Sequence, residues 1–304
     1  MMRSLITLVL GALVAPGILQ QASATSGSFL TPPAPSQSRF LERRDGPSLS
    51  SAAFVVTHPG TGEILSERNG NRVMPIASIT KLMTALVVLD ANQRLNETLT
   101  ITNSDIDRLK GTGSRLPIGS KLTRAEMLHI ALMSSENRAA SALARHYPGG
   151  QQAFIEAMNA KARMLGMWNT RFADSTGLNP RNVSTAHDLA KLVTAASTYP
   201  LVRQYSSAEQ SQVRTGKHQL HYRNSNRLVH ENWPVSLSKT GYIREAGRCL
   251  VMQTKIRQEP VIMVLLNADT PGARVADAKQ VKRWLESAGN TTLAANQTKL
   301  LTHQ

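Results

Sequence analysis

The chain has 304 residues, of which 41% are hydrophobic and 18% are charged, a balance that fits a globular protein with a buried core. The formal net charge of +15 favours anionic partners, but the basic residues are scattered and no aromatic side chains interleave them, so nucleic acid is not an expected partner. Cys249 is the only cysteine, which excludes an internal disulfide, and its apolar neighbours predict a buried strand residue and not a catalytic thiol.

The first 24 residues have the pattern of a cleaved secretory signal. Arg3 precedes an apolar run over residues 5–14, and small residues suitable for cleavage end the segment. The alternative is a membrane anchor, but the run is too short to span a bilayer, so we expect an exported protein with no stable anchor. Residues 25–48 are rich in Ser and Pro and predict a flexible lead-in.

The next segments predict a β-hairpin followed by a buried helix. Residues 53–56 and 63–66 are the two strands, and residues 58–62 supply the turn. In the stretch SITKLMTALVVLDANQ, apolar residues recur at helical spacing, which predicts a mostly buried helix with Ser78 at its start.

The middle of the chain is predicted to be mainly helical. After an irregular stretch at 95–122 with one short strand, Thr123 and Glu126 form a capping box for a helix that ends near residue 133. Three further helices are predicted at 138–147, 151–166 and 184–196. Residues 200–235 are polar, and their pattern predicts no definite element.

The last third of the chain changes to β-like runs. Three runs, at 235–242, 247–256 and 260–269, are separated by gaps short enough for antiparallel turns, and a helix at 273–288 follows. Strands at both chain ends with helices between them predict an α+β fold, with one antiparallel sheet of about five strands, helices on its faces and a helical insert. One domain is expected over residues 49–289, with a polar tail at 290–304.

Ser78 and Lys81 form the first motif with chemical content. They are one helical turn apart and share a face of the predicted helix. A lysine that burial keeps neutral can take the proton of a serine hydroxyl, and the N-terminus of the helix can stabilise an oxyanion. Alone, S-x-x-K is weak, because a helix cap next to a surface lysine is the commoner explanation.

A second motif, Ser135-Glu136-Asn137, lies between two predicted helices. Ser135 can relay a proton between Lys81 and a leaving group, and Asn137 can hold a substrate amide. The alternative for Ser135 is a helix N-cap.

The third motif, Lys239-Thr240-Gly241, lies on a predicted strand. Lys239 would be a fixed cation, Thr240 would bind a carboxylate or carbonyl, and Gly241 would let an extended substrate lie against the strand edge. The N–H of Tyr242 is the natural second oxyanion donor. S-x-x-K, S-x-N and K-T-G in this order are the signature of penicillin-binding proteins and class A β-lactamases.

The segments around these motifs closely resemble the low-molecular-mass penicillin-binding proteins, the serine D-alanyl-D-alanine peptidases of the bacterial periplasm. The resemblance covers roughly residues 50–288, through the stretches IASITKLMTALVVLD, ALMSSENRAASALA, FADSTGLNP and LSKTGYIREAGRCLV. SSENRAA followed by YPGGQQAFIEAMNAKARMLGM is most similar to the D-alanyl-D-alanine endopeptidase branch.

This resemblance implies a β-lactamase/D,D-peptidase-like fold, a periplasmic location and a substrate in peptidoglycan stem peptides. It implies Ser78 as the nucleophile, Lys81 as the base, Ser135 and Asn137 as the second cluster, and Lys239 as the substrate-binding cation. Acylation by a peptide with a D-Ala unit, hydrolysis of the ester and covalent adducts with β-lactams follow from it. No metal or cofactor is expected, because the H-x-x-H pair His218 and His221 has no Glu or Cys at ligand spacing.

Three alternatives remain open. Arg274 matches by spacing an arginine of the carboxypeptidase branch, where it would bind a terminal carboxylate, although it could equally be an exposed arginine at a helix start. A serine β-lactamase shares the motifs, but none of the acidic residues between 166 and 239 stands in the pattern of its deacylating glutamate; they are Asp174, Asp188, Glu209 and Glu231. The last alternative is a non-catalytic wall-binding module with the same fold.

Overall fold

The structure, a computed structural model, describes residues 46–270 and 272–301. The predicted secretory signal at 1–24, nearly all of the lead-in and the end of the tail lie outside the described residues.

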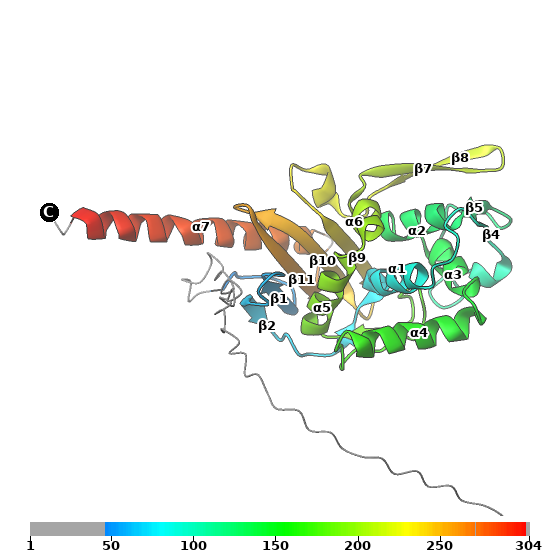
Figure 1. The fold of residues 1–304 in the computed structure, drawn as a ribbon, viewed down its shortest axis with the longest axis horizontal. Helices are drawn as coiled ribbons and strands as arrows, with labels where there is room; N and C mark the ends of the chain where they lie inside the picture. The colour runs from blue at the N-terminus through cyan, green and yellow to red at the C-terminus, as the bar shows by residue number, and fades with distance from the viewer. Residues whose placement is uncertain (1–45, 271, 302–304) are drawn as a thin grey trace, which may run out of the picture. The chain divides into compact units, whose positions relative to one another are not determined.

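A five-stranded antiparallel sheet forms the centre of the fold, with strand order β2-β1-β11-β10-β9 (Figure 1). Its strands are β1 (Ala53–Thr57), β2 (Ile64–Arg68), β9 (Leu237–Ile243), β10 (Gly247–Ile256) and β11 (Glu259–Ala268). The N-terminal hairpin joins the C-terminal strands through β1 and β11, with Val55 opposite Val264, so the predicted sheet from both chain ends is confirmed. β9 lies at the edge of the sheet, where one row of its backbone N–H and C=O groups is not used by a neighbouring strand.

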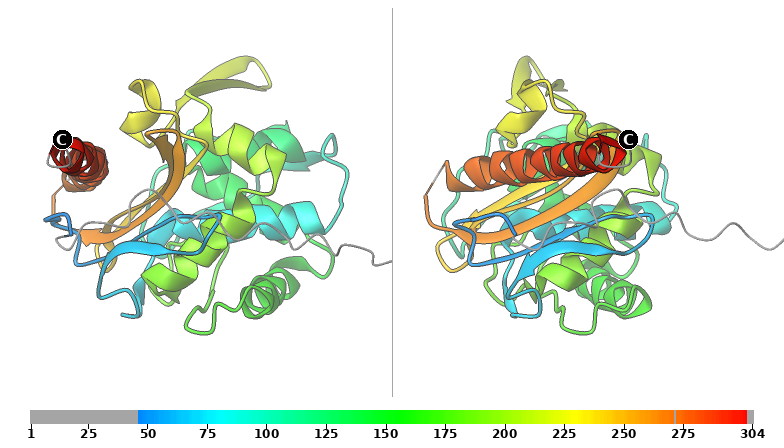
Figure 2. Two further views of the ribbon diagram at one scale, coloured as in Figure 1. Left: turned by 60° about the vertical axis from the view of Figure 1, so that its left-hand side comes forward. Right: turned by 90° about the vertical axis from the view of Figure 1, so that its left-hand side faces the viewer.

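Helices cover both faces of the sheet (Figure 2). On one face, α7 (Ala273–Leu301) buries Val281 and Leu285 against Phe54 and Met263 of the sheet. On the other face lie α5 (Ala186–Ala196) and α1 (Thr80–Asp90). α7 continues past residue 290 into the segment expected to be a polar tail, a stretch that is rich in the good helix formers Ala, Leu, Gln and Lys.

The chain between β2 and β9 forms a largely helical region. Besides α1 and α5 it contains β3 (Met74–Pro75), β4 (Thr98–Thr100), β5 (Lys121–Thr123), α2 (Arg124–Met133), α3 (Asn137–Arg145), α4 (Gly150–Met164) and β6 (Val183–Ser184). The predicted capping box opens α2, because Thr123 Oγ1 accepts from the N–H of Glu126 and the Glu126 carboxylate accepts from the N–H of Thr123. The four helices that the sequence predicted in this region correspond to α2, α3, α4 and α5, and are confirmed.

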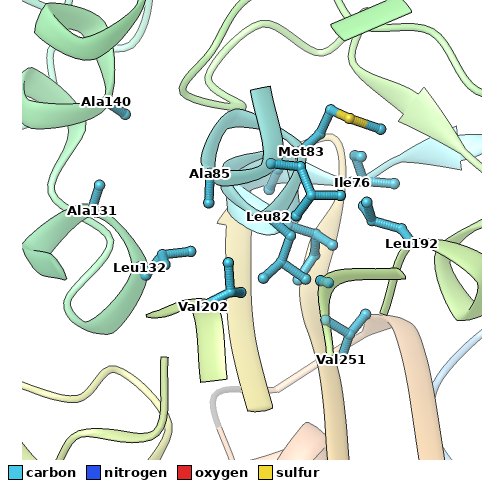
Figure 3. Close-up of a cluster of buried hydrophobic side chains, with 14 of the residues drawn as sticks. Ile76, Leu82, Met83, Ala85, Ala131, Leu132, Ala140, Leu192, Val202 and Val251 are labelled. Atoms are coloured by element: carbon cyan, nitrogen blue, oxygen red, sulfur yellow. The ribbon is translucent and has the colours of Figure 1, made fainter. Parts of the chain in front are cut away.

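α1 is the central helix of this region and is buried on nearly every side. Leu82 and Met83 are fully buried, and their neighbours come from α2, α5, the sheet and α6 (Pro200–Ser207) (Figure 3). A helix that is apolar all round has to lie inside the protein, which explains why the run TALVVL carries no polar face. The lysine on this helix is therefore drawn into the core as well.

Residues 200–235, for which the sequence predicted no element, contain α6, a hairpin and a short 3₁₀ turn. The hairpin strands are β7 (Gln210–Thr215) and β8 (His218–Arg223), and the turn is Arg227–His230. Val213 and Tyr222 are the buried apolar residues of the hairpin, so its sequence lacks the alternation that marks a half-buried strand.

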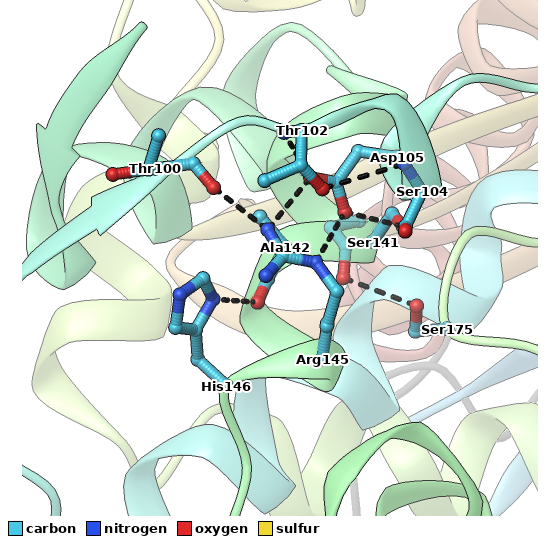
Figure 4. Close-up of polar contacts among 10 residues, drawn as sticks. Thr100, Thr102, Ser104, Asp105, Ser141, Ala142, Arg145, His146 and Ser175 are labelled. Atoms are coloured by element: carbon cyan, nitrogen blue, oxygen red, sulfur yellow. Dashed lines mark hydrogen bonds and ion pairs between the residues drawn. The ribbon is translucent and has the colours of Figure 1, made fainter. Parts of the chain in front are cut away.

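α3 is fixed to its surroundings by a buried carboxylate (Figure 4). Asp105 accepts hydrogen bonds from Ser141 Oγ at 2.9 Å and from two guanidinium nitrogens of Arg145 at 3.2 and 2.8 Å. Ser175 Oγ donates to the carbonyl of Ala140 at 3.0 Å, which ties the helix to the loop at 171–182. Since α3 begins at Asn137, these contacts fix the position of that side chain.

Candidate active site

Ser78 lies in a single 3₁₀ turn (Ala77–Ile79) that directly precedes α1, so the α-helix begins at Thr80, two residues after the start that the sequence predicted. The reason is Ala77, whose φ of +48° is left-handed and cannot continue an α-helix. Two glycines pack on this turn from distant parts of the chain. A Cβ at Gly177 would lie 2.0 Å from the Ala77 oxygen, and a Cβ at Gly241 would lie 3.2 Å from the Ser78 nitrogen. The turn that presents Ser78 is thus held from both sides by residues without side chains.

Lys81 is 1% exposed and makes three hydrogen bonds through Nζ. Its partners are Ser78 Oγ at 3.0 Å, Asn137 Oδ1 at 2.7 Å and the carbonyl oxygen of Thr176 at 2.7 Å. An amide oxygen and a carbonyl can only accept. A neutral amine therefore uses its two N–H groups on Asn137 and Thr176, and its lone pair is left to face the hydroxyl of Ser78.

The environment of Lys81 favours this neutral form. Burial lowers its pKa from 10.5 to about 7, even though the carboxylates of Asp174 and Glu136 act in the opposite direction. At neutral pH a large share of the protein then holds Lys81 as a free amine, in hydrogen-bond contact with Ser78. The pair has the geometry of a serine nucleophile and its base.

The second motif lies at the turn between α2 and α3. Asn137 accepts from Lys81 and donates through Nδ2 to Thr112 Oγ1 at 3.0 Å, so it orients the lysine as well as facing the cleft. The N-cap of α3 is Glu136, whose carboxylate accepts from the N–H of Arg138, so the N-cap alternative for Ser135 is wrong. Ser135 has a φ of +65°, and its hydroxyl has no hydrogen-bond partner among the described residues. The proton-relay role of Ser135 stays a prediction.

The third motif lies beside Ser78, as the packing of Gly241 on its nitrogen shows. Lys239 is buried, donates from Nζ to the carbonyl of Thr240 at 2.9 Å, and has its pKa held well below 10.5 by burial and by the charges of Lys81 and Arg274. Thr240 Oγ1 donates to Ser225 Oγ at 2.7 Å. Tyr242 lies one residue further along the edge strand, so its backbone N–H remains the predicted partner of the Ser78 N–H in an oxyanion hole.

Arg274 comes from the first turn of α7 and reaches the back of the same strand. Its Nη1 donates to the carbonyls of Gly241 at 3.1 Å and of Cys249 at 3.4 Å, so it is not the freely exposed arginine that the alternative described. Within the described part of the chain, Nε and Nη2 make no hydrogen bond. Arg274 therefore adds positive charge next to Lys239 and keeps donors available for an anionic group.

Two parts of the site were not predicted from the sequence to be functional. The loop at 174–179 supplies the Thr176 carbonyl and Gly177, and it is folded around Asp174, whose carboxylate accepts from the N–H groups of Thr176, Gly177 and Asn179. Ser225 is the other, a single serine in a polar stretch with no motif around it. The residues STG in FADSTGLNP were a pattern from which the role of the loop could have been predicted. No pattern around Ser225 indicates its role.

These contacts bring a hydroxyl, a neutral amine and the Lys239-Thr240-Gly241 strand together, with Arg274 behind that strand. Of the predicted site residues, Ser78, Lys81 and Asn137 are joined by hydrogen bonds, and Gly241 lies against Ser78. Within the described residues, no cluster of His, Cys, Asp or Glu is suited to hold a metal ion. The arrangement can transfer an acyl group from a peptide to Ser78.

Comparisons with known proteins agree with this geometry. Residues 41–270 match the Peptidase S11 family, described as D-alanyl-D-alanine carboxypeptidase. The chain is 48% identical over 250 residues to a D-alanyl-D-alanine endopeptidase of Pseudomonas aeruginosa, with 81% of each chain covered. It is 46% identical over 244 residues to the endopeptidase of the same name in Escherichia coli, with 79% of each covered.

Among solved structures, the Streptomyces K15 DD-transpeptidase matches with a TM-score of 0.75 and 27% sequence identity. The match covers 80% of this chain and 99% of that one. This similarity confirms the predicted fold class.

Proposed function

The chain belongs to the Peptidase S11 family, and from this premise we propose that it acts as a serine D-alanyl-D-alanine endopeptidase that opens the peptide cross-links of peptidoglycan. The observation that carries the mechanism is the three-way contact of Lys81, because it directs the lone pair of a neutral amine at the Ser78 hydroxyl. The high identity to two endopeptidases along most of the chain supports the choice of reaction.

Acylation follows from the geometry. Lys81 takes the proton of Ser78 as Oγ attacks the carbonyl of the D-alanyl residue, and the developing oxyanion lies between the N–H groups of Ser78 and Tyr242. The proton passes from Lys81 through the hydroxyl of Ser135 to the leaving amine as the C–N bond breaks. Water then attacks the ester as Lys81 accepts one of its protons, the bond between Oγ and the acyl carbon breaks, and Lys81 returns the proton to Ser78. A β-lactam enters the same first step, but its leaving nitrogen stays tethered, so a long-lived adduct on Ser78 is expected.

The carboxypeptidase reaction is the second candidate, because Arg274 retains free donors beside Lys239. Together they suit a terminal carboxylate. A β-lactamase is disfavoured, since Asp174, the one of the four acidic residues whose charge acts on Lys81, accepts hydrogen bonds from backbone N–H groups of its own loop with both carboxylate oxygens. That carboxylate holds the loop together, which is a structural role.

We also propose that the protein is exported and works in the periplasm, where its substrate lies. The support is the signal-like pattern of residues 1–24. Within the described residues, no helix combines the length and the apolar character that crossing a bilayer requires.

Incubation with two purified substrates tests the proposed reaction. Mass spectrometry would follow a cross-linked muropeptide dimer and a pentapeptide monomer in parallel. Conversion of dimer to monomers with little release of D-alanine from the pentapeptide is the expected result. Release of D-alanine without loss of dimer would instead assign the carboxypeptidase reaction.

A further inference from the structure

A pocket of about 520 Å³ opens beside Ser78 and Lys81 and extends past Ser135, beyond the groups that the mechanism above uses. Three segments form its wall: the loop that carries Arg115, the turn at 134–137 between α2 and α3, and the stretch at 221–225 that ends β8. The last of these belongs to the polar region for which the sequence predicted no element.

Two hydroxyls connect the pocket to the reaction. Ser135 lines it, and Ser225 lines it while accepting a hydrogen bond from Thr240 of the third motif at 2.7 Å. If Ser135 delivers the proton to the leaving amine, then whatever is attached to that amine lies on the side of Ser135. The pocket is therefore placed to receive the leaving group and not the acyl group.

The lining of the pocket suits an anion. Arg115 and Arg223 are exposed in its wall, and the side chain of Arg223 makes no hydrogen bond or ion pair with the described residues. Among the described residues that line the pocket Glu136 is the only acidic one, and its Oε1 already accepts from Ser114 Oγ at 2.7 Å and from the N–H of Arg138 at 3.1 Å. The guanidinium of Arg115 lies 5.5 Å from the ring centre of Tyr222, which holds this cation in place.

Tyr222, whose ring lies next to Arg115, also has an unused donor. Tyr222 is 2% exposed, and its hydroxyl is buried without a hydrogen-bond partner within the described part of the chain. Buried hydroxyls are normally paired, and an unpaired one indicates a group that a ligand or water satisfies. Because this hydroxyl is buried, the donors that an anion in the pocket could reach are the two guanidinium groups.

We propose that this pocket binds the second stem peptide of a cross-link, the one that leaves as the amine, through a carboxylate held by Arg223 and Arg115. This inference rests on the proposed endopeptidase function. The carboxyl group next to the leaving nitrogen has the position of the terminal carboxylate of D-alanine, beside Lys239 and Arg274. The carboxylate proposed for this pocket is therefore one further along the leaving stem peptide. Free D-alanine, the leaving group of a carboxypeptidase, fills only a small part of 520 Å³.

The test compares Arg223→Gln with the matched control Arg214→Gln. Arg214 is an exposed arginine of the same hairpin that does not line the pocket. Each variant is assayed on two muropeptide dimers, one with free carboxylates on the amine-donating peptide and one with these carboxylates amidated. Loss of a charged hydrogen bond predicts a fall in kcat/KM of about tenfold or more for R223Q on the free dimer. On the amidated dimer R223Q should match wild type, and R214Q should match wild type on both.

Complete labelling of every variant by a fluorescent penicillin shows that the fold and the nucleophile are intact. Equal cleavage of the free dimer by wild type and R223Q would overturn the pocket assignment while leaving the endopeptidase function in place. An equal loss for R223Q on both dimers would overturn it too, because the effect would not depend on the carboxylate. Wild-type protein that takes the label but opens neither dimer would refute the proposed function and this inference with it.

Discussion

Replacing Ser78 by alanine is expected to abolish both acylation by penicillin and cleavage of cross-linked dimers. The hydroxyl is the group that Lys81 contacts at 3.0 Å, and no other hydroxyl contacts this amine in the described residues. Loss of the nucleophile from a covalent mechanism should lower the rate by at least about 10⁴-fold. Gel fluorescence after incubation with a labelled penicillin, and mass spectrometry of dimers, measure the two effects.

The control for this variant is Ser104→Ala. Ser104 is exposed, and its hydroxyl takes part in no hydrogen bond within the described residues, so this change should leave labelling as in wild type. If the Ser78→Ala protein were still labelled at a measurable rate, another residue would have to be the nucleophile.

The second large effect is expected from Gly177→Ala, a change of one methyl group outside the three motifs. The new Cβ would lie 2.0 Å from the Ala77 oxygen, and the φ of +83° is already unfavourable for alanine. The contact is with backbone, so the turn that carries Ser78 has to move. We expect a loss of stability of about 3 kcal/mol or more, or a folded protein whose acylation is slower by at least about a hundredfold.

Gly62→Ala is the control for this variant, because it introduces backbone strain without a steric clash. Gly62 has a similar φ of +72°, but nothing lies within 4 Å of a Cβ built there. This variant should lose only about 1 kcal/mol and keep full acylation. Thermal unfolding and the acylation rate of both proteins measure the difference, and equal behaviour of the two variants would remove the special role assigned to the contact between Gly177 and Ala77.

Much of the fold could be predicted, because short stretches of the sequence determine where many strands and helices form. The runs around Val55 and Val264 are long enough and apolar enough to be buried strands, and the Thr123–Glu126 capping box marks a helix start without any tertiary information. The central helix was recognisable for the same reason. The pairing of the first and last strands followed from the need to bury both in one sheet.

The catalytic pair was predictable because one helical turn brings its two members together. The supporting groups were not, since they reach the site through tertiary contacts. Ser225 lies in a polar stretch whose strands bury few apolar residues, and the Thr176 carbonyl is a backbone group that no side-chain pattern reveals. The left-handed Ala77 also escaped prediction, because glycines 100 and 164 residues further along the chain make that conformation possible.

The measurement that tests the central claim most directly is the pH dependence of the acylation step. The claim is that neutral Lys81 takes the proton of Ser78, and burial lowers the pKa of Lys81 to about 7. The rate constant at saturating penicillin, which excludes effects on binding, should rise with pH, reach half of its plateau near pH 7, and fall about tenfold for each unit of pH well below this point. A rate that stays flat between pH 5 and 9, or one that rises only near the ordinary lysine pKa of 10.5, would contradict it.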